Sequence, residues 1–306
     1  MPTYGSSTRR ERKRAARRSL WLLAAAVAAC TVRVSAQPSP SLDDVLARIG
    51  TRIEAFYKRV QSVMCVEKVT AQPIRSDLSI DGFARVLEYD LRVEAATDGD
   101  GESSDANFVR ELRKVNGRVP RDRERELTDR NSCLDPNPLS PEPLAFLLAK
   151  NRADYVFTWG GYGKGKDQNL FLIEYRPVER EKPEFIEDKR GREGCFSINL
   201  PVERKRLWVD SQSYEVVRIE EHLKSRVEVR VPVSQQRKSL LPDVIIVDRF
   251  DIITRYKPVS FENPEEQLLL PASIEQIAVL HGAQSNRKTQ VFSNYKRFLT
   301  GGRIVK

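Results

Sequence analysis

The feature that most limits the fold of this chain is a long succession of strand-like segments with no helical crossover between them. In residues 85–94, apolar and charged side chains alternate, which is the pattern of a strand with one buried face. Similar segments lie at 108–115, 168–176, 204–210, 214–222, 225–233, 243–257, 268–280 and 287–299. Because neighbouring parallel strands need a long crossover, this succession predicts a meandering antiparallel sheet. One face of the sheet would pack on the core, and the other would be exposed to solvent.

Two helices are expected beside the strands. The longer covers Leu42 to Val63, where apolar residues recur every three or four positions, and Ser41 with Asp44 forms its N-cap. The shorter covers Pro143 to Lys150 and is apolar nearly all round, which indicates burial. The expected class is therefore α+β, mainly antiparallel β. The periodic residues of the longer helix are Leu42, Val45, Leu46, Ile49, Ile53, Phe56 and Val60.

The first 36 residues have the pattern of an export signal: a basic start, an apolar run from Leu20 to Ala29, and Val34-Ser35-Ala36 before Gln37. We expect this signal to be removed, leaving residues 37–306 as a single mainly-β domain. Two variants stay open. Val27 to Cys30 resembles a lipobox that would acylate Cys30, and Arg17-Arg18 resembles a twin-arginine signal. All three routes lead to an exported protein, periplasmic or, with an acylated Cys30, associated with the outer membrane.

The export signal also changes how the net charge is interpreted. The chain carries 52 Lys and Arg against 43 Asp and Glu, and residues 1–36 hold eight of the basic and one of the acidic residues. The remaining part has a net charge of about +2, in runs of alternating sign. We therefore expect no nucleic-acid partner.

Three cysteines remain after cleavage, without metal-ligand spacing. Cys65 lies in an apolar strand-like stretch and is expected in the core. Cys133 and Cys195 lie in loop-like surroundings that an oxidising compartment could join by a disulfide. Connectivity cannot be read from sequence, so the pair is a candidate only.

Sequence motifs for catalysis are absent. His222 and His281 lie about sixty residues apart, both in strand-like surroundings, and form no zinc motif. There is no G-x-S-x-G, S-x-x-K, P-loop or dinucleotide fingerprint, and the glycine-rich segment 160–165 is expected to be a hairpin loop. Paired carboxylates would serve a glycosidase, but 42 acidic residues form such pairs by chance. We expect no catalytic residue, no metal and no cofactor.

Two groups of residues are candidates for binding. Trp159, Phe171, Tyr175 and Trp208 would line an apolar ligand pocket or, alternatively, belong to ordinary sheet-core packing. The charged run from Asn116 to Arg130 would be an arginine-rich surface for an anionic partner such as a lipid head group, or a solvated turn with internal ion pairs.

Four segments resemble the strand succession of the outer-membrane lipoprotein carrier superfamily. They are Arg206-Leu207-Trp208-Val209-Asp210, Glu215-Val216-Val217-Arg218, Leu270-Pro271-Ala272-Ser273 and the segment from Val291 to Phe298. The resemblance covers roughly residues 165–300, with the Leu42 to Val63 helix in the expected N-terminal place. It implies a half-open curved sheet or barrel packed over that helix. Cys65-Val66-Glu67 and residues 115–123 are also similar to segments of a group of exported bacterial proteins.

The chain departs from true carriers in a charged insertion at about 97–130 and a Pro-rich loop at about 135–143. No residue matches a carrier's lipid-handling site, so fold transfers more readily than function. Three hypotheses follow. The first is a non-catalytic carrier or binding protein for a lipid or other apolar ligand in the bacterial envelope. The second is an envelope sensor or protein-interaction module with a protein partner, and the third a carboxylate-dependent hydrolase.

Overall fold

The structure is a computed structural model, and the description is limited to part of the chain. The residues described are 40–60, 62–95, 106–122, 124–125, 139–140, 143–179, 182–187, 196–239, 241–262 and 264–297. The export signal, Cys30, Cys133, Cys195 and most of the Pro-rich loop lie outside these ranges. The predictions of cleavage, acylation and a disulfide therefore stay predictions.

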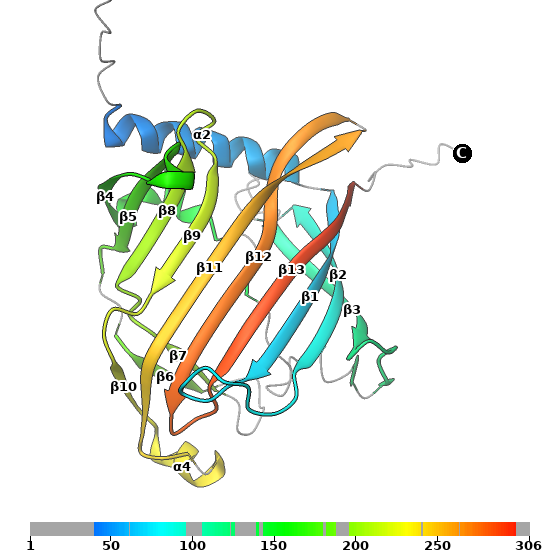
Figure 1. Cartoon of the computed structure of the whole chain (residues 1–306), viewed down its shortest axis with the longest axis vertical. Coiled ribbons are helices and arrows are strands. Elements are labelled where there is room, and N and C mark those ends of the chain that lie inside the picture. The colour runs from blue at the N-terminus through cyan, green and yellow to red at the C-terminus, as the bar shows by residue number, and fades with distance from the viewer. Residues whose placement is uncertain are drawn as a thin grey trace, which may run out of the picture. The chain divides into compact units, whose positions relative to one another are not determined.

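An open antiparallel sheet of eleven strands forms the main part of the fold (Figure 1). Its order is β3-β2-β1-β13-β12-β11-β9-β8-β5-β4, and β10 also pairs with β11. The strands are β1 (Val63–Pro73), β2 (Arg85–Ala95), β3 (Ala106–Val115), β4 (Tyr155–Tyr162), β5 (Leu170–Pro177), β8 (Arg204–Asp210), β9 (Val216–His222), β10 (Val227–Arg230), β11 (Val244–Glu262), β12 (Glu265–His281) and β13 (Asn286–Arg297). Within the described residues β3 and β4 do not pair, so the curved sheet stays half open.

Smaller elements complete the described fold. β6 (Glu184–Glu187) and β7 (Phe196–Asn199) form a separate hairpin. Three single 3-10 turns, η2 (Ala145–Leu147), η3 (Arg152–Asp154) and η4 (Gly165–Asp167), lie beside β4 and β5 in sequence, and the short helix α4 (Val233–Ser239) precedes β11. The predicted class, α+β with a half-open antiparallel sheet over an N-terminal helix, is confirmed.

Helix α2 (Leu42–Val60) runs across the ends of the strands (Figure 1). The Ser41 hydroxyl accepts a hydrogen bond from the Asp44 amide at 3.1 Å, as the N-cap prediction required. The helix ends three residues before the predicted boundary, because Val63 already begins β1. Its apolar face is buried against the sheet through Val45, Leu46, Ile49, Ile53, Tyr57 and Val60.

The second predicted helix is wrong in type. Only η2 forms at Ala145–Leu147, and Leu148 is already extended at ψ 145°. A single tight turn suffices to bury Leu144, Leu147 and Leu148, so continuing the helix would gain no further apolar contact. The glycine-rich segment lies in the hairpin of β4 and β5 as predicted, but its first three residues belong to β4 rather than to the loop.

A tight turn at Asn116-Gly117, a dipeptide that favours such turns, follows β3. Both residues have positive φ, 48° and 80°, as a mirror-image turn requires. The Asn116 amide oxygen accepts a hydrogen bond from the Val86 amide at 2.8 Å, and this contact ties the turn to β2. The turn thereby sets the register at the edge of the sheet.

Candidate functional site

The inner face of the sheet, defined as the face toward α2, is apolar where β5, β8 and β9 cross beneath the helix. Ile173, Leu207 and Ile219 stand side by side on these three strands and are almost completely buried. Ile49 and Ile53 of α2 belong to the same cluster. Because the apolar stripe of α2 and the apolar row of the sheet face each other, burial of both drives their association.

Three of the four predicted ligand residues gather on this inner face. The rings of Trp159 and Phe171 are 5.2 Å apart, and Tyr175 stacks on Phe146 at 4.5 Å. Phe171 and Tyr175 are buried by surrounding side chains. Trp208 lies apart from them: it alternates with the inward-facing Leu207 and Val209, so its side chain points to the opposite face.

A narrow groove separates α2 from the sheet further along the helix. Its cavity volume is about 50 Å³, which is room for a water molecule or two. None of the four predicted ligand residues lines it. The groove is lined by Arg52, Ile53, Ala55, Phe56, Arg59, Leu144, Glu215, Val216, Tyr256, Leu268 and Leu269. These residues come from α2 and several distant segments, and the only sequence signal for them was apolar periodicity.

Polar contacts join α2 to one hairpin turn and to two strands. Arg48 donates to the Tyr214 hydroxyl at 3.1 Å, and Arg52 donates to the Ser213 carbonyl at 3.0 Å, both in the β8–β9 turn. Toward the other end of the helix, Arg59 donates to the Gln267 carbonyl of β12 at 2.6 Å, and the Arg59 carbonyl accepts from Arg297 of β13 at 2.9 Å.

The other half of the inner face, over β1, β3 and β13, holds a buried charged group. Glu67 is fully buried and pairs with Arg110, whose Nε donates to Glu67 Oε2 at 2.6 Å. Gln290, also fully buried, donates from Nε2 to Glu67 Oε1 at 2.7 Å. A buried carboxylate needs such partners, because an unpaired charge in the interior is costly.

Burial displaces the pKa of two further groups on this half. Desolvation raises the pKa of the Cys65 thiol to about 12, and the negative charge of Glu67 adds to the effect. The predicted core position of Cys65 is confirmed, and the thiol is neutral and unreactive there. Lys288 stands opposite Gln276 in the sheet, and desolvation lowers the pKa of its ammonium group to about 8.

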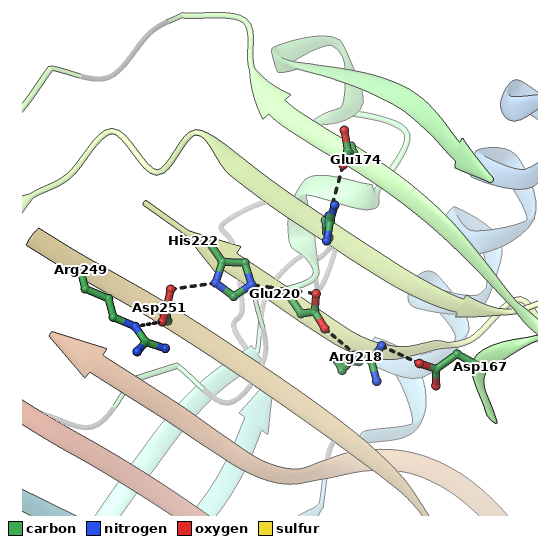
Figure 2. Close-up of polar contacts among 8 residues, drawn as sticks. Asp167, Glu174, Arg218, Glu220, His222, Arg249 and Asp251 are labelled. Carbon is green, nitrogen blue, oxygen red and sulfur yellow. Dashed lines mark hydrogen bonds and ion pairs between the residues drawn. The ribbon is translucent and has the colours of Figure 1, made fainter. Parts of the chain in front are cut away.

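The outer face carries a chain of ion pairs instead (Figure 2). Arg218 lies between Asp167 at 3.3 Å and Glu220 at 2.9 Å. His222 follows, with Nδ1 at 2.8 Å from Asp251 and Nε2 at 4.0 Å from Glu220. Basic and acidic side chains thus alternate along this face of β9 and β11.

Arg249 extends this chain at one end, where it also pairs with Asp251 (Figure 2). Arg206 forms a separate pair on the same face, donating to Glu174 at 3.2 Å. The guanidinium of Arg218 lies 4.4 Å from the ring centre of Trp208, which gives this tryptophan a cation–π contact. Trp208 is therefore part of the outer polar surface.

Neither histidine belongs to a recognisable catalytic group. His222 is the last residue of β9 and His281 the last of β12, where it pairs with Asp248. The strand-like surroundings predicted for both are thus confirmed. Within the described ranges, no group of three or more His, Cys, Asp or Glu side chains is placed to hold a metal ion.

The carboxyl groups with displaced pKa values all shift downward. Two hydrogen bonds from the Arg118 guanidinium and one from the Arg121 amide lower the pKa of Glu124 to about 2. The pKa values of Asp77 and Asp248 are lowered as well. A glycosidase acid needs the opposite shift, so none of these three groups has the property that the hydrolase hypothesis requires.

Comparison with known proteins identifies similar solved structures. No family model and no curated protein sequence matches the chain. A LolA superfamily protein from Nitrosomonas europaea is 11% identical, with 84% of this chain and 94% of that chain covered and a TM-score of 0.36. A domain from Vibrio parahaemolyticus, described as an outer membrane lipoprotein-sorting protein, is 10% identical, with 84% and 94% covered and the same TM-score of 0.36.

A DUF1329 family protein from Desulfovibrio piger is 9% identical, with 84% of this chain and 95% of that chain covered and a TM-score of 0.39. The similar structures thus include a member of the superfamily that the sequence resembles.

In the described part of the chain, no helix combines the length and the apolar character needed to cross a bilayer.

Proposed function

We propose that this protein is an exported, non-catalytic carrier or binding protein for a lipid or other apolar ligand in the bacterial envelope. The observation that supports this most is the groove between α2 and the sheet. Ile53 and Phe56 line it from the helix, and Val216, Leu268 and Leu269 line it from the strands. An acyl chain fits such walls because its binding removes apolar surface from water on both sides.

Ligand entry requires α2 to move away from the sheet. Pockets that bind ligands enclose about 300–1,000 Å³, whereas the groove encloses about 50 Å³. Polar contacts that oppose the movement include those of Arg48 and Arg52 with the β8–β9 turn, that of Arg59 with β12, and that of Arg297 in β13 with the Arg59 carbonyl. Each such hydrogen bond contributes about 0.5–1.5 kcal/mol, so a bound acyl chain could compensate for their loss.

A pair of alanines on α2 gives a test with a matched control. Ala55 lines the groove, whereas Ala47 is exposed on the same helix. Ala55→Trp fills the groove with an indole ring, and we expect it to weaken uptake of a fluorescent fatty acid about tenfold or more, while Ala47→Trp leaves uptake unchanged. Equal uptake by both variants, or none by the wild-type protein, would contradict the proposal.

The ligand itself can be identified by native mass spectrometry. Mature protein purified gently from a bacterial envelope would carry a stoichiometric lipid, which organic extraction and lipid analysis would name. Protein free of lipid that also rejects fatty-acid probes would favour the second hypothesis, an envelope sensor or interaction module.

The place of the protein in the envelope is a separate part of the proposal. We infer cleavage before Gln37, with acylation of Cys30 as the alternative that would attach the protein to the outer membrane. Intact mass distinguishes the two products. If Cys30→Ser leaves membrane association unchanged, the lipoprotein alternative is wrong.

A further inference from the structure

The buried charged group on the β1, β3 and β13 half of the inner face holds a distant piece of the chain. We call Glu67, Arg110 and Gln290 the main-chain clamp. The amide of Leu139 donates to Gln290 Oε1 at 2.7 Å, and its carbonyl accepts from Gln290 Nε2 and Arg110 Nη2, both at 3.2 Å. Glu67 holds both donors in place through its own bonds to Arg110 and Gln290.

These contacts recognise a backbone rather than a side chain. The clamp offers one acceptor and two donors to the N–H and C=O of a single residue, which are the groups that an added strand would present. Any extended residue except proline supplies the same two groups. The clamp is therefore suited to bind polypeptide main chain of varied sequence.

The side chain of Leu139 adds a preference for aliphatic residues. It packs against an inner-face cluster formed by Cys65, Leu91, Ile274 and Phe292. Leu139 is half-buried, and a charged side chain packed against these apolar groups would lose part of its hydration, which is costly. The combined site thus accepts an extended segment with a leucine-like residue at its centre.

The composition of the clamp indicates a role beyond stability. Glu67 and Gln290 are fully buried, and burial of a paired carboxylate is often no more stabilising than apolar packing of the same volume. An apolar row would anchor a loop through side chains alone. Glu67 instead orients Gln290 and Arg110 toward one peptide group. This arrangement provides specificity for main chain.

We propose that the main-chain clamp is a binding site for an extended segment of a protein partner, and that Leu139 of this chain occupies it in cis. The partner segment carries an aliphatic residue at the place of Leu139 and forms the same three hydrogen bonds. This site is separate from the groove under α2, since none of its residues lines that groove. A result that contradicts the lipid-binding proposal therefore does not contradict this one, and the reverse is also true.

Competition with the tethered Leu139 determines how the site must be tested. A tethered segment has an effective concentration in the millimolar range, so a free peptide competes poorly with it. Leu139→Gly removes the side-chain anchor of the occupant and leaves the clamp residues unchanged. The probe is a fluorescent synthetic peptide with the sequence of residues 135–143, Asp-Pro-Asn-Pro-Leu-Ser-Pro-Glu-Pro.

We expect the Leu139→Gly protein to bind this peptide at least about tenfold more tightly than the wild-type protein, measured by fluorescence polarisation. A second peptide carries N-methyl-leucine at the position of Leu139. It lacks the N–H that would donate a hydrogen bond to Gln290 Oε1. It should bind about tenfold more weakly to the same variant, which corresponds to about 1.4 kcal/mol for one well-placed hydrogen bond. Because both peptides meet the same protein, a folding defect cannot produce this difference.

Leu241→Gly serves as the control, because Leu241 is a half-buried leucine packed against a different cluster. It should leave peptide binding at the wild-type level. Circular dichroism verifies the fold of each variant, and Leu139→Ala replaces Leu139→Gly if the latter is unfolded. The proposal is overturned if the Leu139 variant binds no more tightly than wild type, or if it binds the N-methyl peptide equally well.

Discussion

Removing Arg110 tests how far the buried pair with Glu67 supports the inner face. In Arg110→Met the aliphatic stem is largely kept, but the guanidinium is lost. The Glu67 carboxylate, whose side chain is 0% exposed, then retains Gln290 as its remaining hydrogen-bond donor among the contacts described above. Breaking a buried ion pair from one side costs about 3–5 kcal/mol. The Arg110 side chain is 21% exposed, so we expect a loss near the lower end, about 3 kcal/mol.

The assay is urea unfolding followed by circular dichroism at pH 7. Arg113→Met is the matched control on the same strand, because Arg113 is 44% exposed and pairs with Asp90 at 3.3 Å. An exposed pair of this kind contributes at most about 1 kcal/mol. The double variant Glu67→Leu/Arg110→Met should lose less stability than Arg110→Met alone, since no buried charge is left unpaired.

Two results would refute the reasoning. One is that Arg110→Met loses no more stability than Arg113→Met. The other is that Glu67→Leu/Arg110→Met loses as much stability as the separate losses of Glu67→Leu and Arg110→Met added together.

Three further predictions concern single residues. Gly117→Val should reduce the free energy of unfolding by about 1–2 kcal/mol, because Gly117 has φ +80°, whereas Gly117→Asn should change it little; equal losses in urea unfolding would contradict this. The Cys65 pKa is raised from 9.0 to about 12, so the unfolded thiol ionises first, and wild type should lose stability relative to Cys65→Ala above pH 9. Parallel pH profiles would exclude that effect. The Lys288 pKa is lowered from 10.5 to about 8, so wild type should gain stability relative to Lys288→Met as pH rises from about 8 to 10.5; a flat difference would be inconsistent with a desolvated ammonium group.

Most strands could be predicted because their signals are local. The alternation at 85–94 and 204–210 corresponds closely to β2 and β8. β4 was missed because it contains two glycines, and β6 and β7 are only four residues long. The second helix was predicted from composition, but its leucines are buried by a single turn. Local patterns fail where packing can satisfy the same residues in a shorter conformation.

The arrangement of the inner face could be predicted only in part. Trp159, Phe171 and Tyr175 share a face because β4 and β5 are consecutive antiparallel strands. The different orientation of Trp208 could have been inferred from its inward-facing neighbours Leu207 and Val209. The groove under α2 could not be predicted, because its residues approach each other only when the helix lies on strands that follow it by more than 150 residues in sequence.

The sequence by itself determined the elements whose signals lie within a few residues: the amphipathic helix, the antiparallel strands and the Asn116-Gly117 turn. The tertiary structure alone decided which distant strands became neighbours. β1 pairs with β13, and this pairing places Glu67 beside Gln290, 223 residues later in the chain. It also decided that the groove is nearly closed, at about 50 Å³. Such features depend on the simultaneous packing of the whole chain, for which no local pattern exists.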